Sequence, residues 1–104
     1  MVKYIQSLAE FQDIMKSEKV IVIDFTAKWC GPCKAIAPFF DEFSKTYNEK
    51  IECYKLDVDE MEDIAIDCNI SAMPTFQFFK NGLKIDEFTG ANAEKLRLKI
   101  EKLI

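Results

Sequence analysis

Residues 29–34 of the chain read WCGPCK, so two cysteines, Cys30 and Cys33, are separated by two residues. Cysteines at this spacing can close a disulfide without large backbone movement. The run 20–25, just upstream, is almost entirely apolar and predicts a buried strand, whereas apolar residues downstream recur at helical spacing. A C-x-x-C pair at a strand-to-helix junction is typical of a redox-active dithiol. The stretch therefore predicts both a βα unit and thiol chemistry.

The order of the two cysteines predicts their roles. A thiolate, not a thiol, attacks a disulfide. At the start of a helix, free N–H groups and the helix dipole favour the negative charge of Cys30, while Cys33 lies one turn further on and is expected to be less exposed. We therefore expect Cys30 to form a mixed disulfide with the substrate and Cys33 to resolve it. The alternative is a structural disulfide or two inert thiols.

Composition excludes several functional classes. The chain has 104 residues with 49% hydrophobic content, which predicts one domain over residues 1–104 with its own core. The formal charge of −4 argues against nucleic-acid binding, and no apolar run is long enough to span a membrane. The N-terminus lacks the pattern of a secretory signal. We therefore expect a cytoplasmic, reducing environment.

The other cysteines and a metal site need separate consideration. The chain has four cysteines and no histidine, and only Cys30 and Cys33 form a close pair. A structural zinc site usually needs two such pairs or histidines, so zinc is the weaker alternative. Cys53 falls in a predicted strand and Cys68 on the apolar side of a short predicted helix. Both are interpreted first as small hydrophobic residues in or near the core.

The rest of the chain alternates strand and helix patterns. Ser7 opens a capping box, Asp59 and Asn92 are candidate caps of later helices, and Asn81-Gly82 is a strong hairpin signal. Strands are expected over residues 2–5, 19–25, 51–58, 75–80 and 83–89, where Gly90 ends the last one, and helices after Ser7, from about residue 30 to 48, after Asp59 and after Asn92. This order predicts an α/β fold with a mixed sheet and helices on both faces.

Apolar residues at helical spacing indicate which helix faces are buried. They are Leu8, Phe11 and Met15 in the first helix; Ile36, Phe39, Phe40, Phe43 and Tyr47 in the second; Met61, Ile64, Ala65 and Cys68 in the third; and Ala93, Leu96, Ile100, Leu103 and Ile104 in the last.

Asp24 is anomalous, because every other residue of the run 20–25 is apolar. Burying a carboxyl group raises its pKa or costs several kcal/mol. With a pKa near neutrality, Asp24 could accept the proton of Cys33 as that thiol attacks. The alternative is a paired structural carboxylate without a catalytic role.

Taken together, these motifs resemble the thioredoxin family over essentially the whole length of the chain. The resemblance implies the thioredoxin fold, with a central mixed five-stranded β-sheet flanked by four helices. Thr26, where some bacterial members carry an aromatic residue, is nearer the eukaryotic cytosolic type. The matching residues are the stretch 29–34, Asp24, Pro38, KLDVD at 55–59, MPTF at 73–76, Asn81-Gly82 and Gly90.

The resemblance also implies roles for individual residues. Asp24 serves the resolving step, with Lys55 as its electrostatic partner, and the Met73–Pro74 peptide bond is cis and faces the cysteines. The exposed backbone of Met73 then offers a docking edge for an extended substrate peptide. The alternative for Trp29 is plain core packing. The expected substrate-binding residues are Trp29, Gly31, Pro32, Met73, Pro74, Thr75, Gly90 and Ala91.

The family further implies a protein-disulfide reductase that binds no cofactor and no metal. Its electrons come from NADPH through thioredoxin reductase, and its clients are disulfide-containing proteins, peroxiredoxin-like or reductase-like. In the family, a Gly-Pro pair between the two cysteines is typical of members that reduce disulfides. We expect a monomer. Two alternatives stay open, a binding module and an oxidase or isomerase of an oxidising compartment. Cys68 matches a regulatory cysteine of some animal members, whose partner cysteines are replaced here by Met61 and Ala72.

Overall fold

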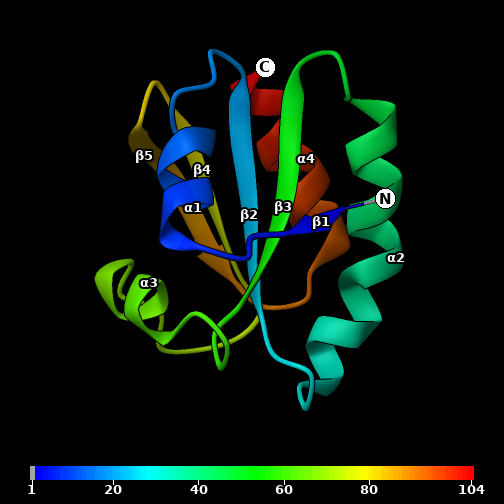
Figure 1. Cartoon of the computed structure of the whole chain (residues 1–104). Coiled ribbons are helices and arrows are strands. Elements are labelled where there is room, and N and C mark those ends of the chain that lie inside the picture. Colours follow the sequence, from blue (N-terminus) through cyan, green and yellow to red (C-terminus); the bar gives the residue numbers. More distant parts are fainter. Residues whose placement is uncertain (1) are drawn as a thin grey trace.

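A computed structural model describes residues 2–104 (Figure 1). Met1, with which the expected domain begins, lies outside the described residues. The elements are β1 (Lys3–Tyr4), α1 (Leu8–Ile14), β2 (Val20–Thr26), α2 (Gly31–Thr46), β3 (Ile51–Asp57), α3 (Glu62–Asp67), β4 (Thr75–Lys80), β5 (Leu83–Thr89) and α4 (Ala93–Leu103). The predicted order of elements is confirmed, with ends that differ by a few residues.

Within residues 2–104 the strands form one five-stranded sheet in the order β1-β3-β2-β4-β5. β3 pairs with β1 and β2 in parallel, whereas β4 pairs antiparallel with both β2 and β5. The sheet is therefore mixed, as predicted. The middle strand, β2, ends at the lower edge of the sheet in Figure 1, where the chain turns into α2.

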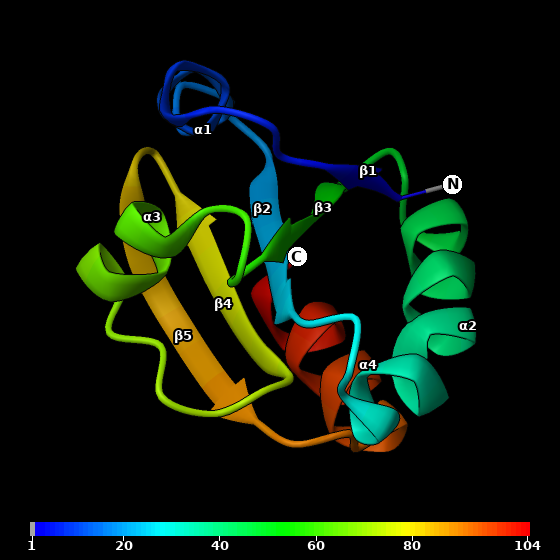
Figure 2. The same cartoon turned by 60° about the horizontal axis from the view of Figure 1, so that its bottom comes forward.

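The four helices cover both faces of the sheet, α1 and α3 on one and α2 and α4 on the other (Figures 1 and 2). Side chains of β2 point alternately to the two sides. Val20 and Val22 join the apolar cluster under α2 and α4, while Ile21, Ile23 and Phe25 join the cluster under α1 and α3. Asp24 therefore faces the same side as Val22, toward α2.

Local signals account for the ends of several elements. The hydroxyl oxygen of Ser7 accepts a hydrogen bond from the amide of Glu10 (3.1 Å), and the side-chain oxygen of Asn92 accepts one from the amide of Lys95 (2.9 Å). Asn81 and Gly82 have φ values of 53° and 79°, as a type I′ hairpin turn requires. These capping and turn predictions are confirmed.

The prediction that Asp59 caps the third helix is wrong. Met61 occupies the cap position of α3 and makes no side-chain hydrogen bond there. The turn before α3 is instead held by Asp57, whose Oδ1 accepts hydrogen bonds from the amides of Asp59 (2.9 Å) and Glu60 (3.3 Å). The carboxylate of Asp59 is thus free to bind elsewhere.

Three residues assigned to buried helix faces are exposed: Phe39 (48%), Leu8 (53%) and Ile104 (45%). Successive helix residues are rotated by about 100°. With Phe40 fully buried against the sheet, Phe39 falls on the flank of α2. Leu8 begins α1 and Ile104 follows the end of α4, where no neighbouring element covers them. None of the helices within residues 2–104 is long and apolar enough to cross a membrane.

The core packing predicts a large difference between two adjacent phenylalanines. Phe40 is fully buried, and its ring contacts that of Phe76 edge-on at 5.4 Å between centroids. Phe40→Ala is expected to lower the free energy of unfolding by about 3–5 kcal/mol because it leaves a cavity. Phe39→Ala, the matched control, is expected to cost about 1 kcal/mol or less. Urea denaturation measures both, and equal losses would contradict this assignment of the buried face.

Candidate active site

Cys30 and Cys33 lie where β2 passes into α2, and they form a disulfide with their Cα atoms 5.3 Å apart. Cys30 is the N-cap residue of α2, with extended backbone, and Gly31 and Pro32 occupy the first helical positions. Pro32 there costs no hydrogen bond, because the first amides of a helix have no partner within it. The redox pair is thus built into the first turn of the helix.

Cys33 is expected to be less exposed than Cys30, but exposure barely distinguishes the two cysteines. Cys30 is 4% exposed and Cys33 3%. Hydrogen bonding does distinguish them, because the amide of Cys33 points at the sulfur of Cys30 at 3.2 Å. An amide donor stabilises a thiolate at Cys30. The geometry therefore favours Cys30 as the charged sulfur of the reduced pair.

Asp24 is the buried acid that the sequence predicts. It is 1% exposed, and neither carboxylate oxygen has a hydrogen-bond partner among residues 2–104. Burial raises its pKa from 3.8 to about 7, and the charge of Lys55 opposes this rise. Lys55 is the register partner of Asp24 on β3. A structural carboxylate would be paired, so the unpaired state of Asp24 argues against the structural alternative.

The Met73–Pro74 segment lies beside the disulfide. The peptide bond is cis, as expected, and the carbonyl oxygen of Met73 is 3.7 Å from the Cys30 sulfur. The side chain of Met73 packs against the buried cluster that contains both active cysteines. The carbonyl of Pro74 accepts a hydrogen bond from the amide of Gly90 (2.9 Å), which places the Gly90-Ala91 turn next to this segment. The structure therefore brings together the residues expected to dock substrate.

Trp29 is 67% exposed, so the alternative of plain core packing is wrong. Its indole N–H donates a hydrogen bond to Oδ2 of Asp59 (2.8 Å), the carboxylate expected to cap α3. The bond fixes the ring next to Cys30 while leaving most of it open to solvent. Beside it, a Cβ added at Gly31 would meet no atom within 4 Å other than those of its chain neighbours and its own helix backbone, so the space around Gly31 is open.

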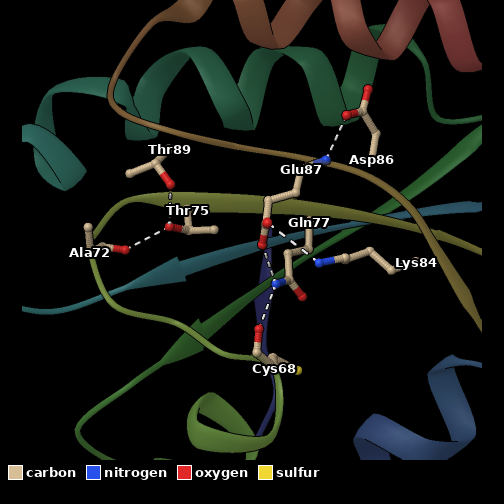
Figure 3. Close-up of polar contacts among 8 residues, drawn as sticks. All are labelled: Cys68, Ala72, Thr75, Gln77, Lys84, Asp86, Glu87 and Thr89. Atoms are coloured by element: carbon tan, nitrogen blue, oxygen red, sulfur yellow. Dashed lines mark hydrogen bonds and ion pairs between the residues drawn. The ribbon is translucent and has the colours of Figure 1, made fainter.

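A polar network that sequence reasoning missed holds the segment that leads to Pro74 (Figure 3). The hydroxyl of Thr75 donates to the carbonyl of Ala72 (2.7 Å) and lies 3.0 Å from that of Thr89. Gln77 is 1% exposed, and its amide nitrogen donates to the carbonyl of Cys68 (2.9 Å) and to Glu87 (2.6 Å). Gln77 interrupts an apolar strand as Asp24 does, and the same signal could have identified it.

The other two cysteines are partly buried free thiols that pack against the two apolar clusters. Burial raises the pKa of Cys53 to about 12 and also raises that of Cys68. Both therefore stay protonated near neutral pH, in agreement with their interpretation as small hydrophobic residues. Within residues 2–104, no cluster of three or more Cys, Asp or Glu residues is arranged to hold a metal ion.

A redox pair at a helix start, which follows a strand with a buried acid and lies beside a cis-proline segment, defines a thiol–disulfide oxidoreductase. Comparison with known proteins agrees: the thioredoxin family model matches residues 2–102. Horse thioredoxin is 51% identical, with all of both chains covered. The chain belongs to the thioredoxin family.

Solved structures show the same relationship. Plasmodium falciparum thioredoxin superposes with a TM-score of 0.95 at 47% identity, over 99% of this chain and 100% of that one. A structure from work on thiol resolving in yeast mitochondrial 1-Cys peroxiredoxin via glutathione/thioredoxin systems has a TM-score of 0.90 at 38% identity, covering 97% of this chain and 94% of that chain. The expected thioredoxin fold and disulfide-reductase activity are therefore confirmed, and disulfide-containing proteins are the implied substrates.

The burial of Asp24 predicts a pH-dependent gain in stability for Asp24→Asn. Because the folded pKa of about 7 exceeds 3.8, folding takes up a proton between these values, and the stability from Asp24 falls as pH rises from about 4 to 7. The difference corresponds to roughly 4 kcal/mol. Asp24→Asn in the oxidised protein is expected to gain up to this amount at pH 8 and almost nothing at pH 4. Denaturant titrations at both values measure it, and a gain independent of pH would contradict the assignment.

Proposed function

We propose that this protein is a general reductant of protein disulfides in the cytoplasm, with Cys30 as nucleophile and Cys33 as resolving thiol. The observation that carries the assignment is the cap position of Cys30, whose sulfur accepts the Cys33 amide and lies 3.7 Å from the Met73 carbonyl. The sulfur of Cys30 therefore has an amide donor that stabilises its negative charge, and it lies beside the backbone of Met73, to which a client peptide could bind.

Two exchange steps reduce one client disulfide. In the dithiol form, the Cys30 thiolate attacks a client sulfur, forms a mixed disulfide and releases the first client thiolate, which takes a proton from water. The Cys33 thiol then passes its proton to the Asp24 carboxylate, and its thiolate attacks the Cys30 sulfur. The Cys30–Cys33 disulfide forms, the second client thiolate leaves and is protonated, and two electrons have moved to the client.

A pKa near 7 suits Asp24 to this transfer, because a base works best when its pKa is close to the working pH. Lys55 contributes by favouring the charged form of Asp24 before the proton arrives. Asp24 returns the proton to Cys33 when the disulfide is reduced again. Thiol–disulfide exchange of this kind runs on the two cysteines and needs no bound cofactor.

Docking of the client uses the backbone of Met73 as a strand edge. Pro74 and Thr75 hold that edge, and Trp29, with Gly31 and Pro32, supplies an apolar surface on the other side of the disulfide. Gly90 and Ala91 complete the rim through the contact of Gly90 with the Pro74 carbonyl. Recognition mainly through backbone atoms suits clients of varied sequence.

The reduced form must be regenerated, and we propose NADPH as the source of electrons, through thioredoxin reductase. We further propose a monomer with one domain over residues 1–104. A peroxiredoxin-like or reductase-like enzyme is the proposed client class, and the yeast 1-Cys peroxiredoxin system of the similar structure supports the first.

Insulin reduction tests the whole proposal. With NADPH and a thioredoxin reductase, the protein is expected to reduce insulin with continuous NADPH consumption. Dithiothreitol in place of the reductase is the control. If the protein reduces insulin with dithiothreitol but not with NADPH and thioredoxin reductase, the proposed electron donor is contradicted. If it reduces insulin with neither source of electrons, the proposed function is contradicted.

Substitution of single cysteines tests the roles. Cys33→Ser is expected to accumulate a mixed disulfide between Cys30 and the client, because no thiol remains to resolve it, and Cys30→Ser is expected to lose turnover. Non-reducing gels and mass spectrometry detect the trapped species. Cys68→Ser is the control and should turn over normally. Repeated turnover by Cys33→Ser without trapping would contradict its resolving role.

A further inference from the structure

Three residues lie in one row across the sheet beneath α2. Tyr4 on β1 is the register partner of Lys55 on β3, and Lys55 is the register partner of Asp24 on β2. Register partners in a sheet point to the same face. The row thus runs from the edge strand to the central strand, with the buried acid at its inner end and Tyr4, a residue that is 42% exposed, at its outer end.

The ammonium group of Lys55 contacts the ring of Tyr4 and forms no ion pair with Asp24 among the described residues. It lies over the Tyr4 ring at 5.9 Å from the centroid, within the range of a cation–π contact. In the part of the chain that the structure describes, Lys55 makes no direct ion pair, and Asp24 accepts no hydrogen bond. Lys55 therefore acts on Asp24 through space, and its effect depends on where its ammonium is held.

An open pocket of about 370 Å³ joins the outer part of this row, Tyr4 and Lys55, to Cys33 of the redox pair. Tyr4 and Lys55 line it together with Cys33, so the pocket connects the edge of the sheet to the resolving cysteine. Its complete lining is Tyr4, Thr26, Ala27, Lys28, Cys33, Lys34, Ala37 and Lys55.

The other charged or titratable groups near Asp24 lie on β3, on α2 and in the loop between β2 and α2. Lys28 and Lys34 line the same pocket from the loop after β2 and from α2, and Cys33 does not titrate in the disulfide. On β3, Cys53 stays protonated and Asp57 directs Oδ1 to backbone amides. β4 presents the apolar Phe76 as the register partner of Asp24. Among these groups, Lys55 is the charge that lowers the pKa of Asp24, against the larger effect of burial.

We propose that Tyr4 is a positioning residue: its ring holds the Lys55 ammonium inside the pocket and thereby sets the proton affinity of Asp24. This inference rests on the proposed role of Asp24 as the acceptor of the Cys33 proton. An ammonium group is strongly hydrated, and β1 is the edge of the sheet, so without the ring Lys55 turns out into water. The carboxylate then loses part of its stabilisation, and Asp24 binds its proton more tightly.

The test is the titration of Asp24 in the oxidised protein, followed by NMR of its ¹³C-labelled carboxyl group, with Asp24→Asn to assign the signal. No active-site thiol titrates in this form. Tyr4→Gln is expected to move the midpoint upward by about half a pH unit, the size of effect that an exposed cation–π contact supports. Tyr4→Phe, which keeps the ring, is the matched control and should leave the midpoint in place. An unchanged or lowered midpoint in Tyr4→Gln would overturn the inference.

A double substitution separates positioning of Lys55 from entry of water. In a Lys55→Met background, Tyr4→Gln is expected to have no further effect on the midpoint, because the charge it would release is gone. A shift that persists there would mean that the ring only shields Asp24, and would overturn the inference. Tyr4 is exposed on an edge strand, so these variants should fold, and circular dichroism checks this.

The pH profile of the resolving step distinguishes this inference from the proposed function. If the profile in Tyr4→Gln moves upward with the NMR midpoint, both are supported. If the NMR midpoint moves and the profile does not, the positioning by Tyr4 is supported and the proposed catalytic role of Asp24 is contradicted.

Discussion

The complete burial of β2 is the constraint on which the rest of the structure depends. All seven of its residues, Val20–Thr26, are buried, because helices cover both faces and β3 and β4 pair with both edges. A carboxyl group in such a strand is almost fully withdrawn from water, and this burial raises the pKa of Asp24. The same strand leads through a short connection into the first turn of α2, which carries the redox pair.

Burial acts on several titratable groups of this protein, and its consequence depends on what else surrounds each one. It raises the pKa of Cys53 and Cys68, which keeps both thiols protonated and unreactive. Cys30 is equally buried, but its sulfur faces the amide of Cys33 at the start of α2. Desolvation thus keeps the thiols of Cys53 and Cys68 protonated, while the amide of Cys33 favours a negative charge on the sulfur of Cys30.

The surface around the disulfide is made by three separate connections: the turn between β2 and α2, the segment from α3 to β4, and the turn after β5. Backbone contacts join them, such as that between the Gly90 amide and the Pro74 carbonyl. The side chains of Thr75 and Gln77, on β4, hold the middle segment through hydrogen bonds to the carbonyl groups of Ala72 and Cys68 (Figure 3). The surface around the disulfide is thus supported by hydrogen bonds from β4 as well as by backbone contacts between its own segments.

The sequence by itself determined the features that depend on residues close together in the chain. The caps Ser7 and Asn92, the Asn81-Gly82 turn and the C-x-x-C pair are set by local backbone chemistry, and Asp24 was visible as one acid in an apolar run. The resemblance to the thioredoxin family supplied the expectation for Met73–Pro74.

Only the tertiary structure decided the contacts that join distant segments. The pairing of Asp59 with Trp29, the partners of Gln77, the exposure of Phe39 and the row from Tyr4 to Asp24 all arise that way. Local signals could not supply them, because hydrogen bonds, burial and through-space charge depend on which side chains the folded sheet brings within a few ångströms of one another.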